Sequence, residues 1–396
     1  MKVLQVSLKP PYPKVDGGCV AIAAMTESLL LSGAEVKLLT METDKHPFRL
    51  EKFPADVASS IAVESVFVDT RIKPLDALLN LFGSSSYNVE RFYSKEFENK
   101  LRLILEDAEF DIIQLESIFC TPYLNVLRQY SNAKIVVRAH NVEFKIWELL
   151  AQNEANPLKK WYLNLLAKRL ERYEVDVLKK VDGIVAITQE DETDFKALGI
   201  DTRSTVTPIG MDINSISCSS LGKKLSLYHL GAMDWAPNVE GIEWFLNKVW
   251  PLINKSIPEA TAHFAGRKMP ASLLSRSTAN LTVEGEVADA SEFISDKNIA
   301  VIPILSGSGM RVKIIEALAH GKVVITTSLG ATGIKYKDGI NLLIANTPSE
   351  FVEKLQLLKN EPSLIQAIGS EARKLAEQEY DLNKLSSKLT YFYGKL

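Results

Sequence analysis

Short runs of apolar residues alternate with longer stretches of helical spacing along the whole chain. In the first half, strands are predicted at 2–8, 35–40, 110–116, 133–140, 182–188 and 204–210. Such alternation is typical of βαβ units, which place their strands in one parallel sheet. Because these runs are apolar on both faces, we expect helices to cover the sheet on both sides.

The pattern pauses at 210–224, a polar stretch that we interpret as a linker between domains. It then resumes, with strands predicted at 225–231, 261–266, 280–285, 299–305, 322–327 and 341–345. The tail from 349 onward is predicted to be helical, with a break near 380–381. We therefore expect an α/β protein of two Rossmann-like, doubly wound domains that face each other across a cleft, with ligands beyond the carboxyl ends of the strands.

The length and composition agree with this division. A chain of 396 residues is too long to fold around one compact core. We expect one domain at 1–212, a second at 213–379, and a helix at 380–396 that packs back on the first. The net charge of −3 argues against nucleic acid as a partner. The 3 cysteines show neither disulfide nor zinc spacing, which favours a reducing cytoplasm.

Nothing in the sequence predicts a membrane span. The opening stretch, MKVLQVSLKPPYP, is expected to be a first strand rather than a signal peptide. The apolar runs are shorter than the ~18 residues that a membrane span needs. A cytoplasmic protein is therefore expected, and any membrane contact would be peripheral.

One stretch, IAVIPILSGSGMRVKIIEALAHGKVVITT at 299–327, carries the strongest candidate chemistry. Its SGSG turn lacks bulk, so the backbone can approach a ligand closely. The helix expected to begin near Met310 offers free N–H groups and a positive dipole end to an anion. Arg311 and Lys313 add two full charges, and arginine can bind a phosphate with two hydrogen bonds. The pattern predicts a phosphate site.

Glu316 lies three positions after Lys313, near the same helix face. A carboxylate among apolar neighbours needs a donor, which either a ribose diol or a neighbouring cation would supply. The alternative is an ordinary ion pair between Glu316 and Lys313. The stretch fits neither the Walker A loop nor the dinucleotide fingerprint.

Two further candidate loops lie in the first half. The turn VDGGC places Asp16, Gly17 and Gly18 between a strand and a helix, where a ligand could approach the backbone, although many such turns are only structural. His140 and Asn141 end the predicted strand AKIVVRAH. His140 could bind a sugar hydroxyl or a leaving phosphate, or instead cap the next helix. No Cys, His or Asp cluster has metal-ligand spacing, so no metal is expected.

The predicted helix at 156–180 combines apolar and basic residues. Its apolar positions at helical spacing are Leu158, Trp161, Tyr162, Leu165, Leu166, Leu170, Tyr173 and Val177. Lysine and arginine crowd the remaining positions. We interpret it as a core-packed helix with a solvated basic face. The alternative is peripheral contact with the anionic inner face of a membrane.

Several blocks together resemble a known family. GSGMRVKIIEALAHGKVVITTSLGATGI is similar to the donor-site signature of GT-B glycosyltransferases of the GT4-like family (glycosyl transferases group 1). HLGAMDWAPNVEGIEWFLNKVWPLI, at 229–253, resembles a subgroup found in bacterial surface-polysaccharide assembly. DGGCVAIAAMTESLLLSGAEVKLLT, RAHNVE and VTPIGMD agree in order and spacing, so the resemblance covers essentially the whole chain.

The resemblance implies that the second domain holds a nucleotide-diphosphate sugar. Glu316 matches the second Glu of the family's E-x7-E motif, which binds the nucleotide ribose, whereas Ser308 stands where the family has its first Glu. Backbone groups of Gly309 and Met310 are expected to substitute for that missing Glu. Many relatives carry a G-R…K pair where this chain has GAMDWAPN, so Arg311 is expected, with Lys313, to take over the charge role.

The resemblance also implies the walls of the pocket. Gly231, Trp235 and Asn238 would shape it, although Trp235 could instead be a core aromatic that covers the loop. Gly285 and Val287, in the stretch GEV, match a loop that contacts the nucleobase through its backbone, and a plain turn is the alternative.

The implied activity is transfer of a sugar to a glycan or lipid-linked acceptor, mostly with retention of configuration. Arg311, Lys313 and His140 are the expected catalytic residues, and Asp16 and Asn141 are expected on the acceptor side. No cofactor is expected, because the two cations stand in for a divalent metal. The alternatives are a nucleotide-sugar epimerase of the same shape and a non-catalytic nucleotide-sugar-binding protein.

Overall fold

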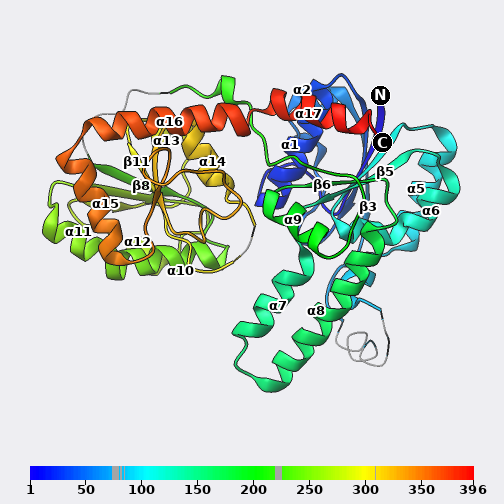
Figure 1. The fold of residues 1–396 in the computed structure, drawn as a ribbon, viewed down its shortest axis with the longest axis horizontal. Helices are drawn as coiled ribbons and strands as arrows, with labels where there is room; N and C mark the ends of the chain where they lie inside the picture. Colours follow the sequence, from blue (N-terminus) through cyan, green and yellow to red (C-terminus); the bar gives the residue numbers. More distant parts are fainter. Residues whose placement is uncertain (74–79, 81–82, 84, 219–224, 308) are drawn as a thin grey trace. The chain divides into compact units, whose positions relative to one another are not determined.

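The computed structural model describes residues 1–73, 80, 83, 85–218, 225–307 and 309–396. The chain divides into two compact units (Figure 1). Unit 1 comprises Met1–Met211 together with Leu382–Leu396, and unit 2 comprises Asp212–Asp381.

Unit 1 is built on a parallel sheet that has seven strands among the described residues, in the order β3-β2-β1-β4-β5-β6-β7. The strands are β1 (Lys2–Ser7), β2 (Glu35–Glu42), β3 (Ile61–Phe67), β4 (Ile112–Glu116), β5 (Lys134–Ala139), β6 (Gly183–Ala186) and β7 (Ser204–Val206). The six strands predicted for this half are confirmed, and β3 was missed. β3 is an edge strand with mostly half-exposed side chains, so its sequence lacks the continuous apolar run of a buried strand.

Helices cover both faces of this sheet, as the apolar runs predicted. They are α1 (Gly17–Leu31), α2 (Ala55–Ser60), α4 (Tyr87–Glu90), α5 (Lys95–Asp107), α6 (Leu124–Tyr130), α7 (Glu143–Asn153), α8 (Pro157–Leu178), α9 (Gln189–Ala197) and α17 (Leu382–Tyr393). Val3 packs with Met25 of α1 and Leu389 of α17, whereas the next residue, Leu4, belongs to the core of α5, α6 and α8. Successive side chains of β1 therefore enter cores on opposite faces.

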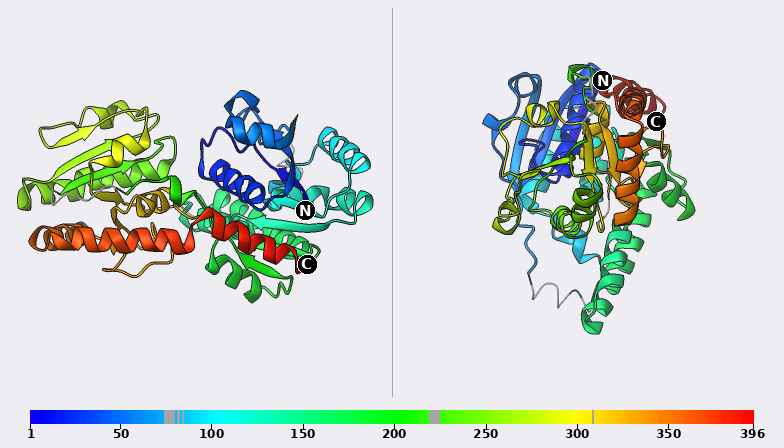
Figure 2. Two further views of the ribbon diagram at one scale, coloured as in Figure 1. Left: turned by 90° about the horizontal axis from the view of Figure 1, so that it is seen from above. Right: turned by 90° about the vertical axis from the view of Figure 1, so that its left-hand side faces the viewer.

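The last helix, α17, is a structural part of unit 1. It lies beside α1 (Figures 1 and 2), and the Ser386 hydroxyl donates to the backbone oxygen of Ser28 at 2.6 Å. At its end, the Tyr393 hydroxyl donates to Oε1 of Gln114 in β4 at 2.5 Å. These contacts anchor the end of the chain to the middle of the sheet.

Unit 2 repeats the design with a parallel sheet whose six described strands run in the order β10-β9-β8-β11-β12-β13. They are β8 (Ser226–Leu230), β9 (Thr261–Ala265), β10 (Leu281–Val283), β11 (Ile299–Ile302), β12 (Val323–Thr326) and β13 (Leu343–Ile344), and all six were predicted. The helices are α10 (Ala236–Trp244), α11 (Trp250–Ser256), α12 (Ala271–Leu274), α13 (Ala290–Ser295), α14 (Val312–Ala319), α15 (Pro348–Asn360) and α16 (Ser363–Glu379).

Two predictions concern the boundaries of unit 2, the linker before it and the helix break after it. The predicted linker at 210–224 lies partly outside the described residues. The predicted break near 380–381 is confirmed, since α16 ends at Glu379 and α17 begins at Leu382. None of the helices in the described parts of the chain is both long enough and apolar enough to cross a bilayer.

Both sheets have a topological switch point, where neighbouring strands continue into connections that leave in opposite directions. In unit 1 it lies between β1 and β4, and in unit 2 between β8 and β11. Parallel sheets bind ligands at the carboxyl ends of the strands that flank such a point. The loops that follow β1, β4, β8 and β11 are therefore where each unit is expected to hold its ligand.

Candidate active site

The glycine turn after β11 leads into α14 in unit 2. Gly307 and Gly309 have φ angles of +91° and +82°, which side-chain-bearing residues rarely adopt. The helix begins at Val312, two residues later than predicted, with Arg311 as its extended N-cap residue. The Arg311 side chain makes no capping hydrogen bond. The first amides of α14 thus face the turn without a side-chain cap from that residue.

Arg311 lies inside this turn and not in solvent. Its side chain is 4% exposed, and its guanidinium donates to the backbone oxygens of Gly309 and, at 3.1 Å, of Gly307. It also lies over the ring of Trp235, 5.2 Å from the centroid. Burial lowers the pKa of Arg311 to about 10, so it stays charged at neutral pH. A fixed positive charge therefore backs the turn.

Lys313, in the first turn of α14, is the second cation. Its Nζ donates to Oδ1 of Asn238 at 2.5 Å and lies 3.5 Å from Nε2 of His229. Burial lowers the pKa of Lys313 to about 7; Glu316 opposes this shift and Arg311 adds to it. The ammonium is therefore partly deprotonated at neutral pH, and an arriving anion would favour its charged form.

Gly231, directly after β8, leaves the space in which the Lys313 ammonium lies. A Cβ at this glycine would stand 2.6 Å from Nζ of Lys313 and 3.0 Å from Nε2 of His229. Gly266, after β9, packs against Gly231 so closely that its own Cβ would lie 1.8 Å from the Gly231 oxygen. The two glycines bring the ends of two strands into contact and leave room beside them for the Lys313 ammonium.

His229 has two hydrogen-bonding roles in this geometry. Its Nδ1 lies 2.8 Å from the backbone oxygen of Val301, to which it must donate. Burial, with the field of Lys313, holds the pKa of His229 well below its usual value, so the ring is neutral. The lone pair on Nε2 then faces the Lys313 ammonium. Its position at the end of a buried strand was the only signal in the sequence.

Trp235 and Asn238 belong to the same cluster. Trp235 is the N-cap residue of α10, and its half-buried ring lies 6.0 Å from Nζ of Lys313. Asn238 is buried, and its Nδ2 donates to the backbone oxygen of Ala232 at 2.7 Å, which orients Oδ1 toward Lys313. Trp235 is thus not a fully buried core aromatic.

The remaining candidates of unit 2 lie around this cluster with less direct contacts. Glu316 is exposed on α14, one turn beyond Lys313, and its charge acts on that ammonium. Gly285 accepts a hydrogen bond from the Gly266 amide at 2.9 Å, which places the start of the GEV loop next to the end of β9. Its Cβ position is open space.

Three of the predicted positions add little side-chain chemistry. Val287 and Met310 are half-buried, and the Gly309 oxygen is occupied by Arg311. Ser308 lies outside the described residues.

In unit 1, the turn after β1 is held by Asp16. Its Oδ1 accepts from the Cys19 amide at 2.9 Å and from the Lys9 ammonium at 2.6 Å, and its Oδ2 lies 2.9 Å from Nε2 of His46. Burial acts to raise the pKa of Asp16, but the hydrogen bonds from His46 and Lys9 hold it far below its usual range. A Cβ at Gly18 would stand 2.6 Å from the Lys9 ammonium, whereas Gly17 faces open space. Lys9 is a cation at this loop that the sequence did not reveal.

The side chains of Asp16, Cys19 and His46 are close enough to be considered as metal ligands, with one atom of each within 4.8 Å of the others. Two observations argue against a bound cation. The Lys9 ammonium already occupies one carboxylate oxygen. Burial raises the pKa of Cys19 to about 11, so the thiolate that a metal needs is not formed at neutral pH. The group is better described as a network that fixes the glycine turn.

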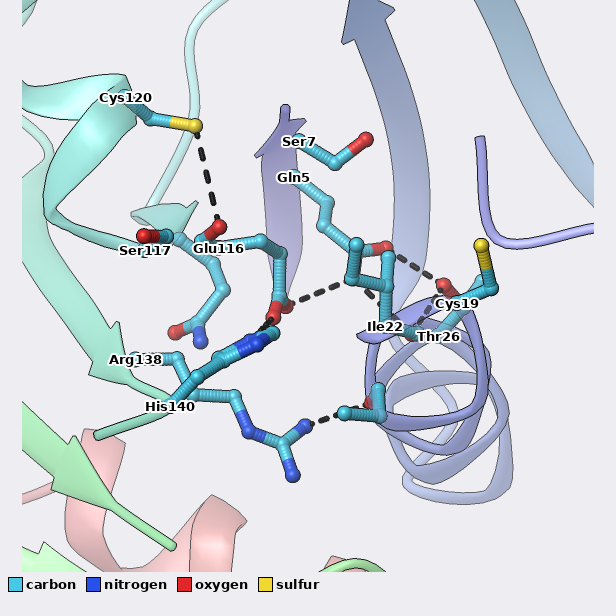
Figure 3. Close-up of polar contacts among 12 residues, drawn as sticks. Gln5, Ser7, Cys19, Ile22, Thr26, Glu116, Ser117, Cys120, Arg138 and His140 are labelled. Atoms are coloured by element: carbon cyan, nitrogen blue, oxygen red, sulfur yellow. Dashed lines mark hydrogen bonds and ion pairs between the residues drawn. The ribbon is translucent and has the colours of Figure 1, made fainter. Parts of the chain in front are cut away.

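His140 directly follows β5, and Figure 3 shows it beside Glu116 at the end of β4. Nε2 of His140 lies 3.3 Å from Oε2 of Glu116. Glu116 is 0% exposed, and its other carboxylate oxygen, Oε1, accepts from Nε2 of Gln5 at 2.8 Å. Burial lowers the pKa of His140, and Glu116 opposes this shift. The carboxylate therefore orients the ring and favours the tautomer with a proton on Nε2.

Glu116 is the site residue that the sequence analysis missed in unit 1. An acid at the carboxyl end of a buried strand, in FDIIQLE, was the available signal. The next residue, Ser117, has a φ of +117°, a strained conformation that is found mostly at functional sites. Buried Arg138, one strand over, acts electrostatically on the same group and donates to the Ala21 oxygen at 3.0 Å. Nδ2 of Asn141 donates to Oε1 of Glu143, the first residue of α7, at 3.4 Å.

Two parallel-sheet α/β units, each with a glycine turn that opens onto a helix at its switch point, have the architecture of the GT-B fold, and the family models establish the activity that goes with it. The family model described as Glycosyltransferase Family 4 matches residues 15–215, and that described as Glycosyl transferases group 1 matches residues 224–360. The chain belongs to glycosyltransferase family 4 and is a glycosyltransferase. The family predicted from the sequence motifs is confirmed.

Individual proteins agree with this assignment. The chain is 23% identical over 403 residues to an uncharacterized 44.6 kDa protein in the cps region of Klebsiella pneumoniae, covering 98% of each chain. Sucrose-phosphate synthase from Thermosynechococcus elongatus has a TM-score of 0.71 at 13% identity, with 100% of this chain and 98% of that chain covered. Anabaena HepE in complex with UDP has a TM-score of 0.69 at 14% identity, with both chains covered completely. The structural similarities establish the GT-B fold.

Proposed function

We propose that this enzyme transfers a sugar from a nucleotide-diphosphate donor, held by unit 2, to a glycan or lipid-linked acceptor, held by unit 1, in the assembly of a surface polysaccharide. One observation supports the donor assignment above all. Arg311 is buried and Lys313 is half-buried at the start of a helix, and both cations lie near the ring of Trp235. Two neighbouring cations at a helix start suit a dianionic ligand such as a diphosphate.

The reaction breaks an anomeric C–O bond and leaves negative charge on the nucleoside diphosphate. Hydrogen bonds to charged groups contribute roughly 1.5–3 kcal/mol each, so the two cations would supply about 3–6 kcal/mol if they acted mainly on the transition state. Enzymes lower barriers by roughly 8–23 kcal/mol. Positioning of donor and acceptor supplies the remainder. Lys313 takes up a proton from solution when the diphosphate binds, so both cations are charged before the anomeric bond breaks.

The other predicted donor contacts follow from the same placement. Glu316, exposed beyond Lys313, binds the ribose diol of the nucleotide. Gly309 and Met310 present backbone groups toward the sugar phosphate, in place of the acid that the family carries at 308. The GEV loop, which begins at Gly285, contacts the base through its backbone. The two cations replace a divalent metal, so no metal is required.

His140 serves the acceptor half of the reaction. With its Nε2 proton directed at Glu116, the Nδ1 lone pair is available to a sugar hydroxyl. The departing phosphate oxygen takes the acceptor proton, which agrees with transfer that retains the anomeric configuration. Asp16 fixes the neighbouring glycine turn, and Asn141 lies on the acceptor side.

The comparisons support the class of substrate and the biological setting. Anabaena HepE has been solved in complex with UDP, with UDP-glucose, and with UDP and glucose. The related Klebsiella pneumoniae protein comes from a cps region. A lipid-linked acceptor would place the reaction at the inner face of the membrane, with the enzyme on the cytoplasmic side.

Binding and transfer assays test this proposal. UDP, GDP and dTDP are first compared by thermal shift, and the best nucleotide is titrated against the wild type and Arg311→Ala. We expect the variant to bind the diphosphate about 10- to 150-fold more weakly, with little change for the free nucleoside, because only the phosphates face the cation. Equal losses for both ligands would contradict the phosphate assignment. Release of free sugar without an acceptor would indicate epimerase or hydrolase chemistry instead.

A further inference from the structure

The helices α7 and α8 form a hairpin that projects from the body of unit 1 (Figures 1 and 2). Only 154–156 separate the two helices, and Asn156 caps α8 by accepting from the amides of Leu158 and Lys159 at 3.0 and 3.2 Å. The capped turn is thus a well-defined end of the hairpin. Its base and its end differ in what covers them.

The base of the hairpin belongs to the core of unit 1. Leu166, Leu170 and Val177 of α8 are buried, in line with the core-packed helix predicted at 156–180. The end does not follow that prediction. Leu149, Leu150, Leu158 and Trp161, which we call the hairpin tip, are 40%, 50%, 78% and 60% exposed. Leu158 and Trp161 have the helical spacing of core residues, but none of the described elements packs over them.

Exposed apolar side chains occur singly on most proteins, but four large ones at the end of one projecting element are unusual. Trp161 is informative because tryptophan prefers the boundary between water and lipid. The tip is convex, which suits a deformable surface better than a rigid groove in a partner.

Basic side chains follow the apolar hairpin tip along α8. Lys168 and Arg172 are exposed and follow Trp161 by seven and eleven positions, so all three lie on one side of the helix. At 1.5 Å per residue, Lys168 lies about 10 Å and Arg172 about 16 Å from Trp161 along the helix axis. Apolar side chains that enter the interfacial layer by about 5–10 Å would leave these two cations at the level of lipid phosphates.

The tip itself adds cations of the same sign. Between 154 and 172 the sequence holds five lysines and arginines and two acids, Glu154 and Glu171. Lys159 pairs with Glu154 at 2.5 Å, and Lys160 donates to the Gln152 oxygen at 3.3 Å, so both ammonium groups stay near the turn. A second copy of this chain would need an acidic, apolar-lined surface to match this charge, whereas anionic lipid matches it directly.

We propose that the hairpin tip docks the enzyme on an anionic phospholipid surface, with Leu158 and Trp161 in the interfacial layer and Lys168 and Arg172 at the phosphates. The surface is separate from the donor cluster of unit 2, so docking does not depend on the proposed transfer reaction. Each cation near such a surface contributes about fivefold in affinity, and the apolar anchors add to this.

Sedimentation with vesicles tests the proposal on the full chain. One set of vesicles is phosphatidylcholine alone, and in the other about a third of the lipid is phosphatidylglycerol. The wild type is expected to bind the anionic vesicles and to bind neutral ones at least about tenfold more weakly. A Leu158→Ser, Trp161→Ser double variant is expected to lose most of this binding. A Lys168→Glu, Arg172→Glu variant should lose the preference for anionic lipid.

A matched control separates docking from general loss of surface apolar groups. Leu103 and Tyr391 of unit 1 are 52% and 70% exposed, and changing both to serine should leave vesicle binding intact. Unaltered melting temperature and nucleotide binding in the tip variant establish that it is folded. Wild-type binding to neither vesicle, or equal binding by the tip variant, would overturn the proposal. So would concentration-dependent self-association that the tip variant abolishes without any binding to vesicles.

Discussion

The depressed pKa of Lys313 leads to a specific prediction for nucleotide binding. Burial lowers this pKa to about 7, far below the usual value for lysine. The charged form is the one that binds a diphosphate, so binding above neutral pH must draw a proton from solution. Affinity should therefore be highest at and below pH 7 and should fall as the pH rises.

The size of the effect follows from the titration. With a pKa of about 7, half of the Lys313 side chains are charged at neutral pH and about a tenth are charged one pH unit higher. The dissociation constant for the diphosphate should rise about fivefold over that unit and about tenfold over the next. The rise ends where binding by the enzyme with neutral Lys313 accounts for the measured affinity. Arg311, with a pKa of about 10, stays charged, and neutral His229 does not titrate in this range.

Isothermal titration calorimetry of the best nucleoside diphosphate measures both consequences. The affinity is followed from about pH 6 to pH 9, and buffers of different ionisation enthalpy report the number of protons taken up, which should approach one at the alkaline end. Lys313→Met removes the charge with little change in shape. Below pH 7 it should bind about 10- to 150-fold more weakly than the wild type, and the two should converge as the pH rises.

Two results would refute this reasoning. The first is a wild-type affinity that stays constant across the range. The second is a Lys313→Met variant with the same slope as the wild type, which would assign the titration to another group.

Two further predictions concern the space and the orientation of the site residues. Gly231→Ala should keep the melting temperature nearly unchanged but weaken nucleotide binding, because its Cβ would displace the flexible Lys313 ammonium. Gly266→Ala should instead lower the melting temperature strongly, because its Cβ would meet backbone at 1.8 Å. Equal melting temperatures of the two variants would contradict this distinction. Glu116→Gln should lower kcat about tenfold or more while nucleotide affinity in unit 2 stays unchanged, since the carboxylate orients His140. Steady-state kinetics, combined with a nucleotide titration, measure both quantities. An unchanged kcat would contradict a role for the oriented His140 ring in the reaction.

The strands of both sheets could be predicted because each is a local feature of the sequence. A buried parallel strand is apolar on both faces, and twelve of the thirteen named strands carry that pattern clearly enough to be found. β3 was missed because an edge strand is half exposed and its sequence is mixed. The start of α14 was predicted two residues early, since the positive φ of Gly309 extends the turn.

The candidate site could be predicted only in part, for a related reason. The glycine turn with Arg311 and Lys313 is contiguous in the chain, so its phosphate-binding chemistry could be predicted from the sequence. Asn238, whose oxygen accepts from the Lys313 ammonium, is 75 positions away, and Glu116 is separated from His140 by 24. No periodicity links residues so far apart, and His229 and Glu116 accordingly gave weak signals.

The sequence by itself determined the alternating α/β pattern, the glycine turns and the residues that carry charge, because each depends on neighbours in the chain. The tertiary structure decided how those charges behave. Lys313 has a pKa near 7 because distant segments exclude water from it, and Leu158 and Trp161 are exposed because no segment in the described part of the chain packs over the end of the hairpin. Desolvation and burial are set by everything that surrounds a side chain, and that is known only once the chain is folded.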